Sequence, residues 1–595
     1  MRLKIVVPRS ISCSGAVLCI TKEGEEPAYY SMFWAGMCGD ENEYWELHFS
    51  ATTPGLYFYH FELETPWGKS FVRNVGRGIG DFAPDGAEFQ QTVYDKAFTT
   101  PDWLRGGIIY QIFPDRFHNS GTKKSGVRTT RVMRRWGEEP FWREEQMNGV
   151  WNNDYFGGDL KGIEEKLPYL ADLNITCIYL NPIFEANSNH RYDTADYEII
   201  DPLLGTEEDL RSLCRAAKKY GIRILLDGVF SHTGCDSKYF NKFQHYDSLG
   251  AYNSKESPYY PWYKFTDYPD GYQSWWGIKL LPEITEENED YRRYICGKDG
   301  VLRKWLRCGI GGWRLDVADE LPDVFLDELR EAVKEEQPDA LILGEVWEEA
   351  TTKVAYGERR RYFLGAQLDT VMNYPFAEAV LNFVRFGNAD AFLDAVMTVI
   401  ERYPPQVTSL LMNHIGTHDT ERAITRLAGE SPEGYGRQWQ YEHNTLSDED
   451  YRKGIELLKL ASLLQYTLPG VPSVYYGDEI GLQGMKDPFN RACMPWDNVN
   501  EKLLRWYRRL GEIRRGCQAF AEGAFIPVYC SHRTVAYKRV CENSEVLCAV
   551  NLDSELARIP LGNDWQNCYT LLGNVPVNGT LYLEQGRYSL LTIQK

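Results

Sequence analysis

The sequence predicts an α/β fold: a (β/α)8 barrel with a small domain inserted after its third strand and a β-sandwich domain at each end. Three observations predict this fold. Short apolar runs alternate with helical patterns through the middle of the chain. One connection between two of these runs is far longer than the others. At both ends of the chain, apolar and polar residues alternate as they do in antiparallel sheets.

Residues 1–100 form the first predicted domain. Apolar and polar positions alternate at 44–49 and 55–63, with a turn at Pro54-Gly55, which is typical of an antiparallel β-sandwich. Exposed aromatic side chains of this domain could bind carbohydrate. The alternative is packing against the barrel or a second subunit, so a homodimer through this domain is also an expectation.

Residues 101–515 form the predicted barrel. Helical stretches at 207–219, 325–335 and 451–466 place apolar residues at spacings of three and four. Chemistry in such barrels takes place at the carboxyl ends of the strands, so the polar residues that end each apolar run are the ones to examine. The apolar strand candidates are 108–113, 175–183, 222–230, 312–318, 341–347, 368–374, 409–413 and 471–476.

The connection between the third and fourth strands predicts an inserted domain over about 232–288. This segment is rich in Tyr, Trp, Pro and Gly, as in Tyr259-Tyr260-Pro261-Trp262-Tyr263, and so high an aromatic content argues against disorder. We expect it to form one wall of the cleft. Alternation returns after residue 515, which predicts a second β-sandwich over 516–595.

Composition excludes several kinds of partner. Lys plus Arg total 65 against 85 Asp plus Glu, a net charge of −20, which disfavours nucleic acid and anionic membranes. Aromatic residues make up 14% of the chain and suit either stacking on sugars or burial. The 14 cysteines lack paired spacing, which favours reduced thiols. Without a secretory signal or a run that could span a membrane, we expect a cytoplasmic protein, or an extracellular one if a leader has been removed.

Three carboxylates lie at the carboxyl ends of predicted barrel strands: Asp316 at the end of the fourth, Glu345 in the last residues of the fifth and Asp419 in the segment into which the seventh leads. Hydrolysis of a glycosidic bond with retention needs a carboxylate nucleophile and a carboxylic acid, and Asp316 and Glu345 fit these roles. Arg314 shares a strand face with Asp316 and should lower its pKa, whereas Glu345, with no adjacent arginine, should stay protonated. Taken alone, an Asp where a strand runs into a helix is more often a helix N-cap, so the assignment of Asp316 depends on the residues that accompany it.

Three histidines, His190, His232 and His418, are neutral donors of the kind that bind sugar hydroxyls. As isolated residues each would more often be structural. Their predicted position at strand ends favours a place in the site.

In their order along the chain, seven segments resemble the motifs of the α-amylase family of glycoside hydrolases, close to its neopullulanase and cyclomaltodextrinase branch. They are 190–193, 227–232, 312–320, 344–347, 418–419, 470–481 and 487–491, and the resemblance extends from 107 to about 511. It implies that Asp316 is the nucleophile, Glu345 the acid and base, and Asp419 the transition-state stabiliser. The substrate-binding residues implied by these motifs are His190, Tyr192, Asp227, His232, Arg314, Glu320, His418, Asp487 and Arg491.

Two neighbouring tryptophans, Trp275 and Trp276, precede a segment that lies beside the cleft in this family. Neighbours on an extended chain face opposite ways, so we expect one ring in the core and one exposed. Trp276 is predicted to line the cleft and stack on a glucose at the leaving-group side. The alternative is that both rings pack between the inserted domain and the barrel.

Departures from the family pattern argue against a required cofactor. Ser231 replaces an asparagine that often ligates calcium, and the loop 118–124 carries Lys123-Lys124 instead of the acidic residues of relatives. Calcium is disfavoured, although Asn153, Asp154 and Asp159 could still supply oxygen ligands. The segment 281–285, Leu-Pro-Glu-Ile-Thr, replaces the usual Met-Pro-Lys-Leu-Asn, which leaves the preferred linkage open.

The sequence thus predicts a retaining hydrolase that cleaves α-1,4 and, in some substrates, α-1,6 bonds of maltooligosaccharides, cyclodextrins, pullulan or starch. A transglycosylase of the same family is one alternative, because it uses the same three carboxylates. A non-catalytic glucan-binding protein on the same barrel is another, although such a protein would be expected to lack at least one of them.

Overall fold

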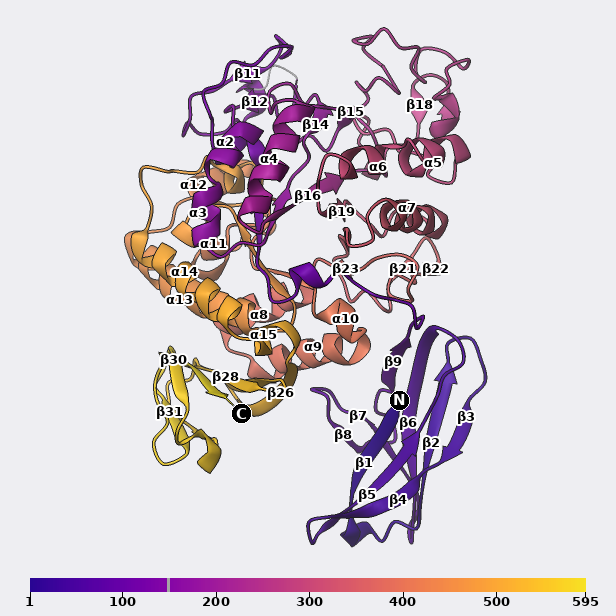
Figure 1. Ribbon diagram of the computed structural model, residues 1–595, viewed down its shortest axis with the longest axis vertical. Coiled ribbons are helices and arrows are strands. Elements are labelled where there is room, and N and C mark those ends of the chain that lie inside the picture. The colour runs from indigo at the N-terminus through magenta and orange to yellow at the C-terminus, as the bar shows by residue number, and fades with distance from the viewer. Residues whose placement is uncertain (147–149, 595) are drawn as a thin grey trace.

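A closed parallel barrel forms the centre of the molecule in the computed structural model, which describes residues 1–146 and 150–594 (Figure 1). The strand order is β23-β20-β19-β16-β13-β10-β25-β24, and a parallel bridge between Met372 and Met412 closes the ring. The predicted barrel is confirmed, and each strand overlaps its predicted run. The strands are β10 (Ile109–Ile112), β13 (Cys177–Leu180), β16 (Arg223–Gly228), β19 (Gly312–Leu315), β20 (Leu341–Gly344), β23 (Thr370–Val371), β24 (Met412–His414) and β25 (Val471–Tyr475).

Most barrel strands, such as β10, β13 and β20, divide their side chains between two cores. Ile109, Tyr179 and Leu343 belong to a cluster inside the barrel, whereas Ile178 and Ile342, one residue away from inward-facing neighbours, pack against the surrounding helices. This division follows from the two-residue period of a strand. It explains why the strands of the barrel are almost continuously apolar.

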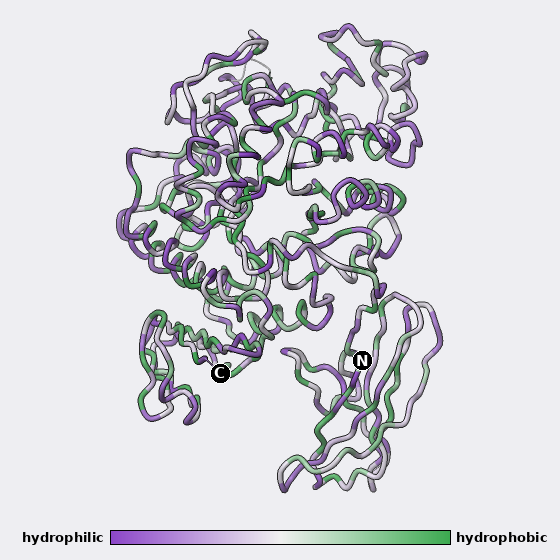
Figure 2. Tube along the Cα trace, in the orientation of Figure 1, coloured by the Kyte–Doolittle hydropathy of each residue, from purple (hydrophilic) through white to green (hydrophobic). Residues whose placement is uncertain are grey.

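Helices cover the outside of the barrel, and Figure 2 shows hydrophobic and hydrophilic residues interleaved along them. Helix α4 (Glu207–Lys219) has the predicted bounds; Thr206 and Asp209 form a capping box at its start. None of the described helices is long and apolar enough to cross a membrane. The other helices around the barrel are α1 (Pro114–Phe117), α2 (Leu160–Glu165), α3 (Leu167–Asp172), α5 (Glu289–Cys296), α6 (Val301–Leu306), α7 (Asp323–Glu336), α8 (Tyr374–Phe386), α9 (Ala389–Arg402), α10 (Pro405–Thr408), α11 (Ala423–Ala428), α12 (Arg437–Glu442), α13 (Asp448–Thr467), α14 (Glu501–Gly516) and α15 (Ala519–Glu522).

The N-terminal part of the chain folds into two facing antiparallel sheets, as predicted. One has the order β1-β5-β4, and the other has the order β3-β2-β6-β7-β8 with β9 paired to β6. Leu3 and Trp45 of the first sheet and Leu18 and Phe61 of the second share one core, so the sheets form a sandwich. The strands are β1 (Arg2–Pro8), β2 (Gly15–Lys22), β3 (Ala28–Ser31), β4 (Phe33–Cys38), β5 (Asn42–His48), β6 (Gly55–Thr65), β7 (Gly68–Asn74), β8 (Gly80–Phe82) and β9 (Phe89–Val93).

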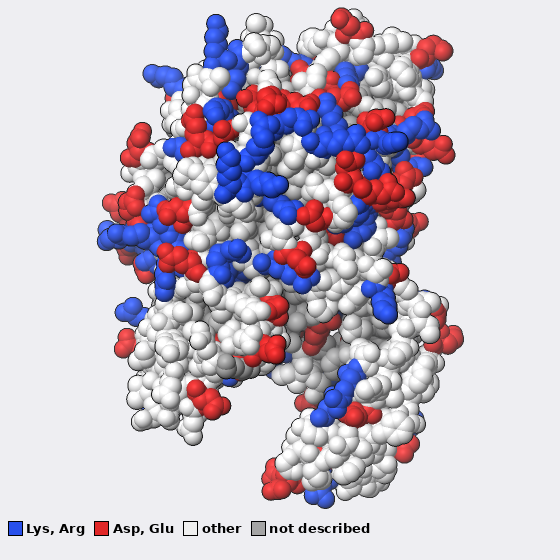
Figure 3. Space-filling view, in the orientation of Figure 1, with Lys and Arg blue, Asp and Glu red and all other residues white. Residues whose placement is uncertain are grey.

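The C-terminal part also forms the predicted sandwich. A sheet of order β26-β27-β28-β32-β30 faces the pair β29-β31, and Leu547 and Leu581 contribute to the core between them. In the view of Figure 3, few charged side chains cover the two terminal β domains, whereas both signs crowd the helices of the barrel. The strands are β26 (Ala524–Ser531), β27 (Thr534–Val540), β28 (Ser544–Asn551), β29 (Ala557–Pro560), β30 (Tyr569–Gly573), β31 (Thr580–Leu583) and β32 (Arg587–Gln594).

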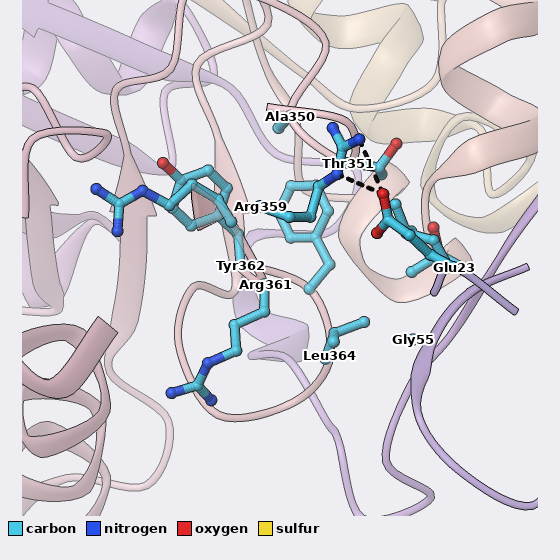
Figure 4. Close-up of a pocket in the computed structure, with 12 residues that line it drawn as sticks. Glu23, Gly55, Ala350, Thr351, Arg359, Arg361, Tyr362 and Leu364 are labelled. Carbon is cyan, nitrogen blue, oxygen red and sulfur yellow. Dashed lines mark hydrogen bonds and ion pairs between the residues drawn. The ribbon is translucent and has the colours of Figure 1, made fainter. Parts of the chain in front are cut away.

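Both terminal domains pack on the barrel. Helix α9 contacts β9 on one side and β26 and β27 on the other. A small cavity of about 160 Å³ lies where the N-terminal sandwich meets the loop that follows β20, and Figure 4 shows the residues that line it. Across it, Arg359 reaches Glu23 with an N–O distance of 2.9 Å. The loop that carries Glu345 is therefore anchored at its far end on the N-terminal domain.

The long connection after β16 contains little regular structure but a dense aromatic core. Its paired strands are β17 (Phe265–Asp267) and β18 (Gly271–Tyr272), and Phe240, Tyr263 and Tyr272 pack together. Isolated bridges from His232 to Glu283 and from Tyr263 to Ile284 tie the last residues of the segment back to its start and its middle. Small paired strands elsewhere are β11 (Val132–Met133), β12 (Asp154–Tyr155), β14 (Phe184–Ala186), β15 (Thr194–Ile200), β21 (Val354–Ala355) and β22 (Glu358–Arg359).

Candidate active site

Strand register brings three carboxylates around one guanidinium. Arg314 on β19 lies opposite Asp227 on β16, and opposite Leu343 on β20, two residues before Glu345. The Arg314 side chain is fully buried. Its Nη1 lies 2.8 Å from both Asp227 Oδ1 and Asp316 Oδ1, and its Nη2 lies 2.8 Å from Glu345 Oε2.

The expectation that Glu345 has no arginine beside it is wrong. Glu345 follows the strand next to β19, so its carboxylate reaches the same guanidinium as Asp316. The expectation that Asp316 has a lowered pKa is also wrong. Burial raises the pKa of Asp316 well above its usual range, and the charge of Glu345 raises it further. Arg314 lowers this pKa, as expected, but its effect is smaller than that of burial. Three buried carboxyls against one guanidinium favour a proton held within the cluster.

Further donors hold the Glu345 carboxyl in position. Its Oε2 accepts a hydrogen bond from the backbone N–H of Val317 (2.9 Å), and its Oε1 accepts one from Trp347 Nε1 (3.1 Å). Val317 has a φ of 37°, a left-handed conformation that a β-branched residue rarely adopts. Such strain at the residue after Asp316 is typical of positions whose backbone donor is needed in a site.

A second network joins Asp419 to the floor of the site. His418 Nε2 lies 3.1 Å from Asp419 Oδ2 and 2.7 Å from the Tyr192 hydroxyl, while Gln111 donates to His418 Nδ1. The proton of neutral His418 is therefore on Nε2. Tyr192 in turn donates to Asp227 Oδ2 (2.9 Å), which connects the two networks. Burial and the charge of Glu345 raise the pKa of Asp419 to about 7, although Arg491 opposes this.

All three predicted histidines are uncharged at neutral pH. Burial lowers the pKa of His190 to about 3 and that of His232 to about 4, and it lowers the pKa of His418 well below its usual value. His190 accepts the backbone N–H of Tyr192 at Nδ1, which leaves Nε2 as a donor. The Nε2 atom of His232 is buried and has no hydrogen-bond partner among the described residues. His190 and His232 can therefore serve a neutral hydroxyl, whereas both nitrogens of His418 are engaged by protein groups.

The neighbouring tryptophans Trp275 and Trp276 both border the cleft, so the expectation that one of them belongs to the core is wrong. Trp276 is 80% exposed and Trp275 is half-buried, with the two rings stacked at 5.5 Å. Trp276 adopts a left-handed backbone at φ 49°, so the pair is not an extended segment with opposite faces. Both indole N–H groups donate to the Glu320 carboxylate, at 2.7 Å from Trp275 and 3.0 Å from Trp276.

A cavity of about 800 Å³ unites most of the predicted residues. Three predicted substrate-binding residues do not border it. Asp227 and Arg314 lie beneath its floor, where they hold other site residues, and Glu320 lies behind the tryptophans that it bonds. The predicted residues that line the cavity are Asp316, Glu345, Asp419, His190, Tyr192, His232, Trp276, His418, Asp487 and Arg491.

The candidate calcium ligands are engaged by protein groups. Lys124 places its ammonium 2.7 Å from Asp159 Oδ2, and Asp159 also caps helix α2. Asp154 accepts hydrogen bonds from Phe141 N and Asn189 Nδ2, while Asn153 donates to a backbone carbonyl. Within residues 1–146 and 150–594, no three His, Cys, Asp or Glu side chains are grouped to hold a metal ion. The donor set around Asp159 fits an ammonium better than a hard divalent cation.

Sequence reasoning missed several polar residues that support the site. Gln111, Tyr179 and Asn181 come from the first two barrel strands; Tyr179 donates to Asp227 (2.6 Å) and Asn181 donates to Tyr192 (2.9 Å). Their signal was a polar side chain near the carboxyl end of an otherwise apolar run. Trp151 and Phe243, which also line the cavity, come from loops whose path the sequence did not indicate.

In enzymes with an eight-stranded parallel barrel, the active site lies at the carboxyl ends of the strands. The carboxylates of this barrel meet at that end, so the fold and the site place the protein among these barrel enzymes. The family model described as "Alpha amylase, catalytic domain" matches residues 111–509. This chain belongs to the alpha-amylase family, which confirms the resemblance seen in its motifs.

Relatives of known name support this assignment. The amylopullulanase of Thermoanaerobacterium saccharolyticum is 36% identical over 550 residues, which cover 84% of this chain and 41% of that protein. The cyclomaltodextrinase of Geobacillus thermopakistaniensis is 36% identical over 480 residues, which cover 78% of this chain and 72% of that protein. This chain therefore spans less than half the length of that amylopullulanase.

Solved structures show the same architecture over most or nearly all of the chain. The type III pullulan hydrolase from Thermococcus kodakarensis superposes with a TM-score of 0.72 at 28% identity, covering 99% of this chain and 96% of that one. The cyclic alpha-maltosyl-(1-->6)-maltose hydrolase from Arthrobacter globiformis gives 0.68 at 29% identity, covering 84% and 100%.

Proposed function

We propose that this protein is a retaining hydrolase of α-glucans. The observation that carries the proposal is the pair Asp316 and Glu345 on the two terminal nitrogens of one buried guanidinium, at the floor of a cavity large enough for several sugar rings. The names of relatives, which include cyclomaltodextrinase, neopullulanase and maltogenic alpha-amylase, support α-glucans as the substrate class.

In the proposed mechanism, Asp316 attacks the anomeric carbon while Glu345 passes its proton to the glycosidic oxygen. The bond to the leaving chain breaks, and a glycosyl ester forms on Asp316. Glu345, now a carboxylate, takes a proton from water, whose oxygen attacks the same carbon and releases Asp316. Arg314 contacts both carboxyls throughout, so it can stabilise whichever is ionised at each step.

The neighbouring groups would hold the sugar. Tyr192, stacked on His418 at 5.3 Å, offers a ring face at the floor of the cavity. His232 Nε2 and Asp419 offer a neutral nitrogen and a carboxylate to hydroxyls, and Asp487 and Arg491, paired at 3.0 Å, are placed for a more distant glucose. Strengthening these contacts as the ring flattens would lower the barrier.

Replacement of Asp316 by Asn and of Glu345 by Gln tests the assignment. Each change should lower kcat on maltotriose by more than about 10⁴-fold, because both residues serve one covalent mechanism. Asp339→Asn is the matched control, since Asp339 is an exposed carboxylate two residues before the start of β20, away from its carboxyl end. Substantial turnover by a folded Asp316→Asn protein would refute the assignment, and products from starch, pullulan and β-cyclodextrin would separate hydrolysis from transfer.

We further propose that activity needs no metal. The ammonium of Lys124 neutralises the buried carboxylate that would be the best calcium ligand of the loop, Asp159.

The fourteen cysteines all lie among the described residues and are free, which supports a reducing, cytoplasmic location.

A homodimer through the N-terminal sandwich is also proposed. Phe33 and Trp34 on β4 and Tyr29 on β3 are 68%, 55% and 60% exposed, an apolar surface that a second subunit would cover. Sedimentation of Phe33→Ser beside the unaltered protein tests this. A protein that is monomeric before the substitution would refute it, and binding of that monomer to starch granules would favour the carbohydrate-binding alternative.

A further inference from the structure

Two buried arginines lie where the barrel meets the C-terminal sandwich. Arg514 on α14 and Arg539 on β27 are 1% and 3% exposed. Their guanidiniums donate to backbone carbonyl oxygens, such as that of Gly107 for Arg514 (3.0 Å) and that of Gly523 for Arg539 (2.9 Å). Within residues 1–146 and 150–594, no carboxylate pairs with either guanidinium. This interface therefore carries buried positive charge that no carboxylate neutralises.

Two thiols lie beside one of these arginines. Burial lowers the pKa of Arg539 to about 10, and the nearby ionisable groups Tyr537, Cys517 and Cys541 oppose this lowering. The interaction is mutual, because a thiolate that stabilises a guanidinium is itself stabilised by it. A cation next to a thiol favours the thiolate, which is the form that reacts with oxidants.

The two sulfur atoms flank a single hydroxyl group. Cys541 Sγ lies 3.2 Å from Ser544 Oγ, and Cys517 Sγ lies 4.0 Å from the same oxygen, so the sulfur atoms are within about 7 Å of each other. Both side chains are half-buried, so a small oxidant can reach them. A disulfide needs a separation of about 2.05 Å, and changes of χ1 rotamer at the two cysteines would supply the approach.

The backbone around each cysteine comes from a different part of the fold. Cys517 follows the last turn of α14, the final helix of the barrel, and its N–H donates to Arg514 O. Cys541 begins the turn between β27 and β28, which a hydrogen bond from Cys541 N to Ser544 O (3.0 Å) closes. A bond between the two sulfur atoms would therefore join the barrel to the C-terminal sandwich.

Several other thiols of the chain are less suited to oxidation. Cys177 and Cys214 are buried, and burial raises the pKa of Cys214 to about 12 and that of Cys177 further still. Cys13 is half-buried like the pair, but burial, together with the charges of Glu43 and Glu64, raises its pKa. Thiols in such surroundings form little thiolate and react slowly.

We propose that Cys517 and Cys541 form a disulfide when the protein meets a small disulfide oxidant such as oxidised glutathione. One thiolate attacks a sulfur atom of the oxidant, whose S–S bond breaks; a mixed disulfide forms and one reduced glutathione leaves. The second thiolate attacks the protein sulfur of the mixed disulfide and releases the second glutathione. The protein loses two electrons and two protons, and the oxidant gains them as two thiols.

The disulfide would stabilise the C-terminal sandwich on the barrel. It closes a loop that contains α15, β26 and β27, and so restricts the unfolded chain. The oxidised protein should melt roughly 2–4 °C above the reduced protein. This site is separate from the proposed hydrolysis, because neither cysteine borders the main cavity.

Peptide mapping of the whole protein tests the proposal. The protein is incubated with oxidised glutathione, its remaining thiols are blocked with iodoacetamide, and the digest is analysed by mass without reduction. The peptides that contain Cys517 and Cys541 should be joined. In Cys517→Ser and in Cys541→Ser, the remaining cysteine of the pair should instead carry one glutathione, and neither variant should gain the rise in melting temperature. Cys13→Ser is the matched control and should keep the bond.

Total glutathione distinguishes a protein disulfide from glutathione adducts. The disulfide consumes one oxidised glutathione and releases two reduced ones. At a fixed ratio of reduced to oxidised glutathione, a tenfold rise in total glutathione should therefore lower the ratio of disulfide to dithiol about tenfold, whereas an adduct would not respond. The proposal is overturned if both thiols are blocked by iodoacetamide after oxidation, if each carries a glutathione, or if either is bonded to a different cysteine.

Discussion

Replacement of Trp276 by Ala separates binding from stability, because the structure leaves this side chain almost uncovered. Trp276 is 80% exposed, so only a fifth of its surface is lost from the folded protein. Full burial of a large side chain contributes about 1.5–3 kcal/mol, and a fifth of that is about 0.5 kcal/mol. The exposed hydrogen bond from Trp276 Nε1 to Glu320 adds about 0.5–1 kcal/mol. We therefore expect a loss of only about 1 kcal/mol in the free energy of unfolding.

The effect of Trp276→Ala on catalysis should be proportionately larger. A ring that stacks on a glucose contributes about 0.5–1.5 kcal/mol beyond area burial, which corresponds to a roughly 2- to 12-fold fall in kcat/KM. The fall should appear on a longer maltooligosaccharide and be smaller on maltotriose, where fewer sugars reach the tryptophan. Melting temperature measured beside both specificity constants checks these values.

Trp67 offers a matched control for this substitution. It lies in the turn between β6 and β7 and is 78% exposed, nearly the same as Trp276, but it borders none of the cavities described above. Trp67→Ala should change melting temperature as little as Trp276→Ala does and leave both specificity constants unaltered. If Trp276→Ala lowers the melting temperature by many degrees and leaves both specificity constants alone, the stacking role is wrong.

Three further results are expected. Exhaustive chelation should leave kcat and melting temperature unchanged; a large fall in melting temperature that calcium reverses would refute the role of Lys124 as the cation beside Asp159. The pKa of Asp419 is raised to about 7, so the native state holds this proton more tightly than the unfolded chain does. The free energy of unfolding should therefore fall as pH rises from about 4 to 7. Urea unfolding should show a shallower fall for Asp419→Asn than for the unaltered protein. Glu320→Gln, which keeps one carbonyl acceptor for two indoles, should lower kcat/KM on long chains less than Trp276→Ala does; an equal or larger loss would place Glu320 itself against the sugar.

The barrel could be predicted from the sequence because its signal is local. Eight apolar runs, each ending in polar residues and separated by helical patterns, specify strand, helix and their order without reference to distant contacts. The same holds for Asp316, Glu345 and Asp419. Each directly follows such a run or lies in the loop after it, and all parallel strands of a barrel end at one face.

Partners across the sheet could not be predicted, since they depend on register rather than on spacing along the chain. Arg314 was correctly placed beside Asp316, two residues away on one strand face, but its contact with Glu345 comes from the next strand. The predicted direction of the pKa change at Asp316 was wrong for the same reason. Burial and the second carboxylate outweigh the arginine, and neither is visible in the sequence.

Loop conformation decided the remaining features of the site. One ring of Trp275 and Trp276 was predicted in the core and the other at the surface. Because Trp276 has a left-handed backbone, the two rings instead stack on each other, and both donate to Glu320. The loop that carries Lys124 brings a cation onto Asp159, and the turn between β27 and β28 brings Cys541 near Cys517. The sequence by itself thus determined the elements and the carboxylates they carry, because apolar periodicity is a local property. Only the tertiary structure decided the charge, the partners and the exposure of those groups, because these depend on residues far away along the chain.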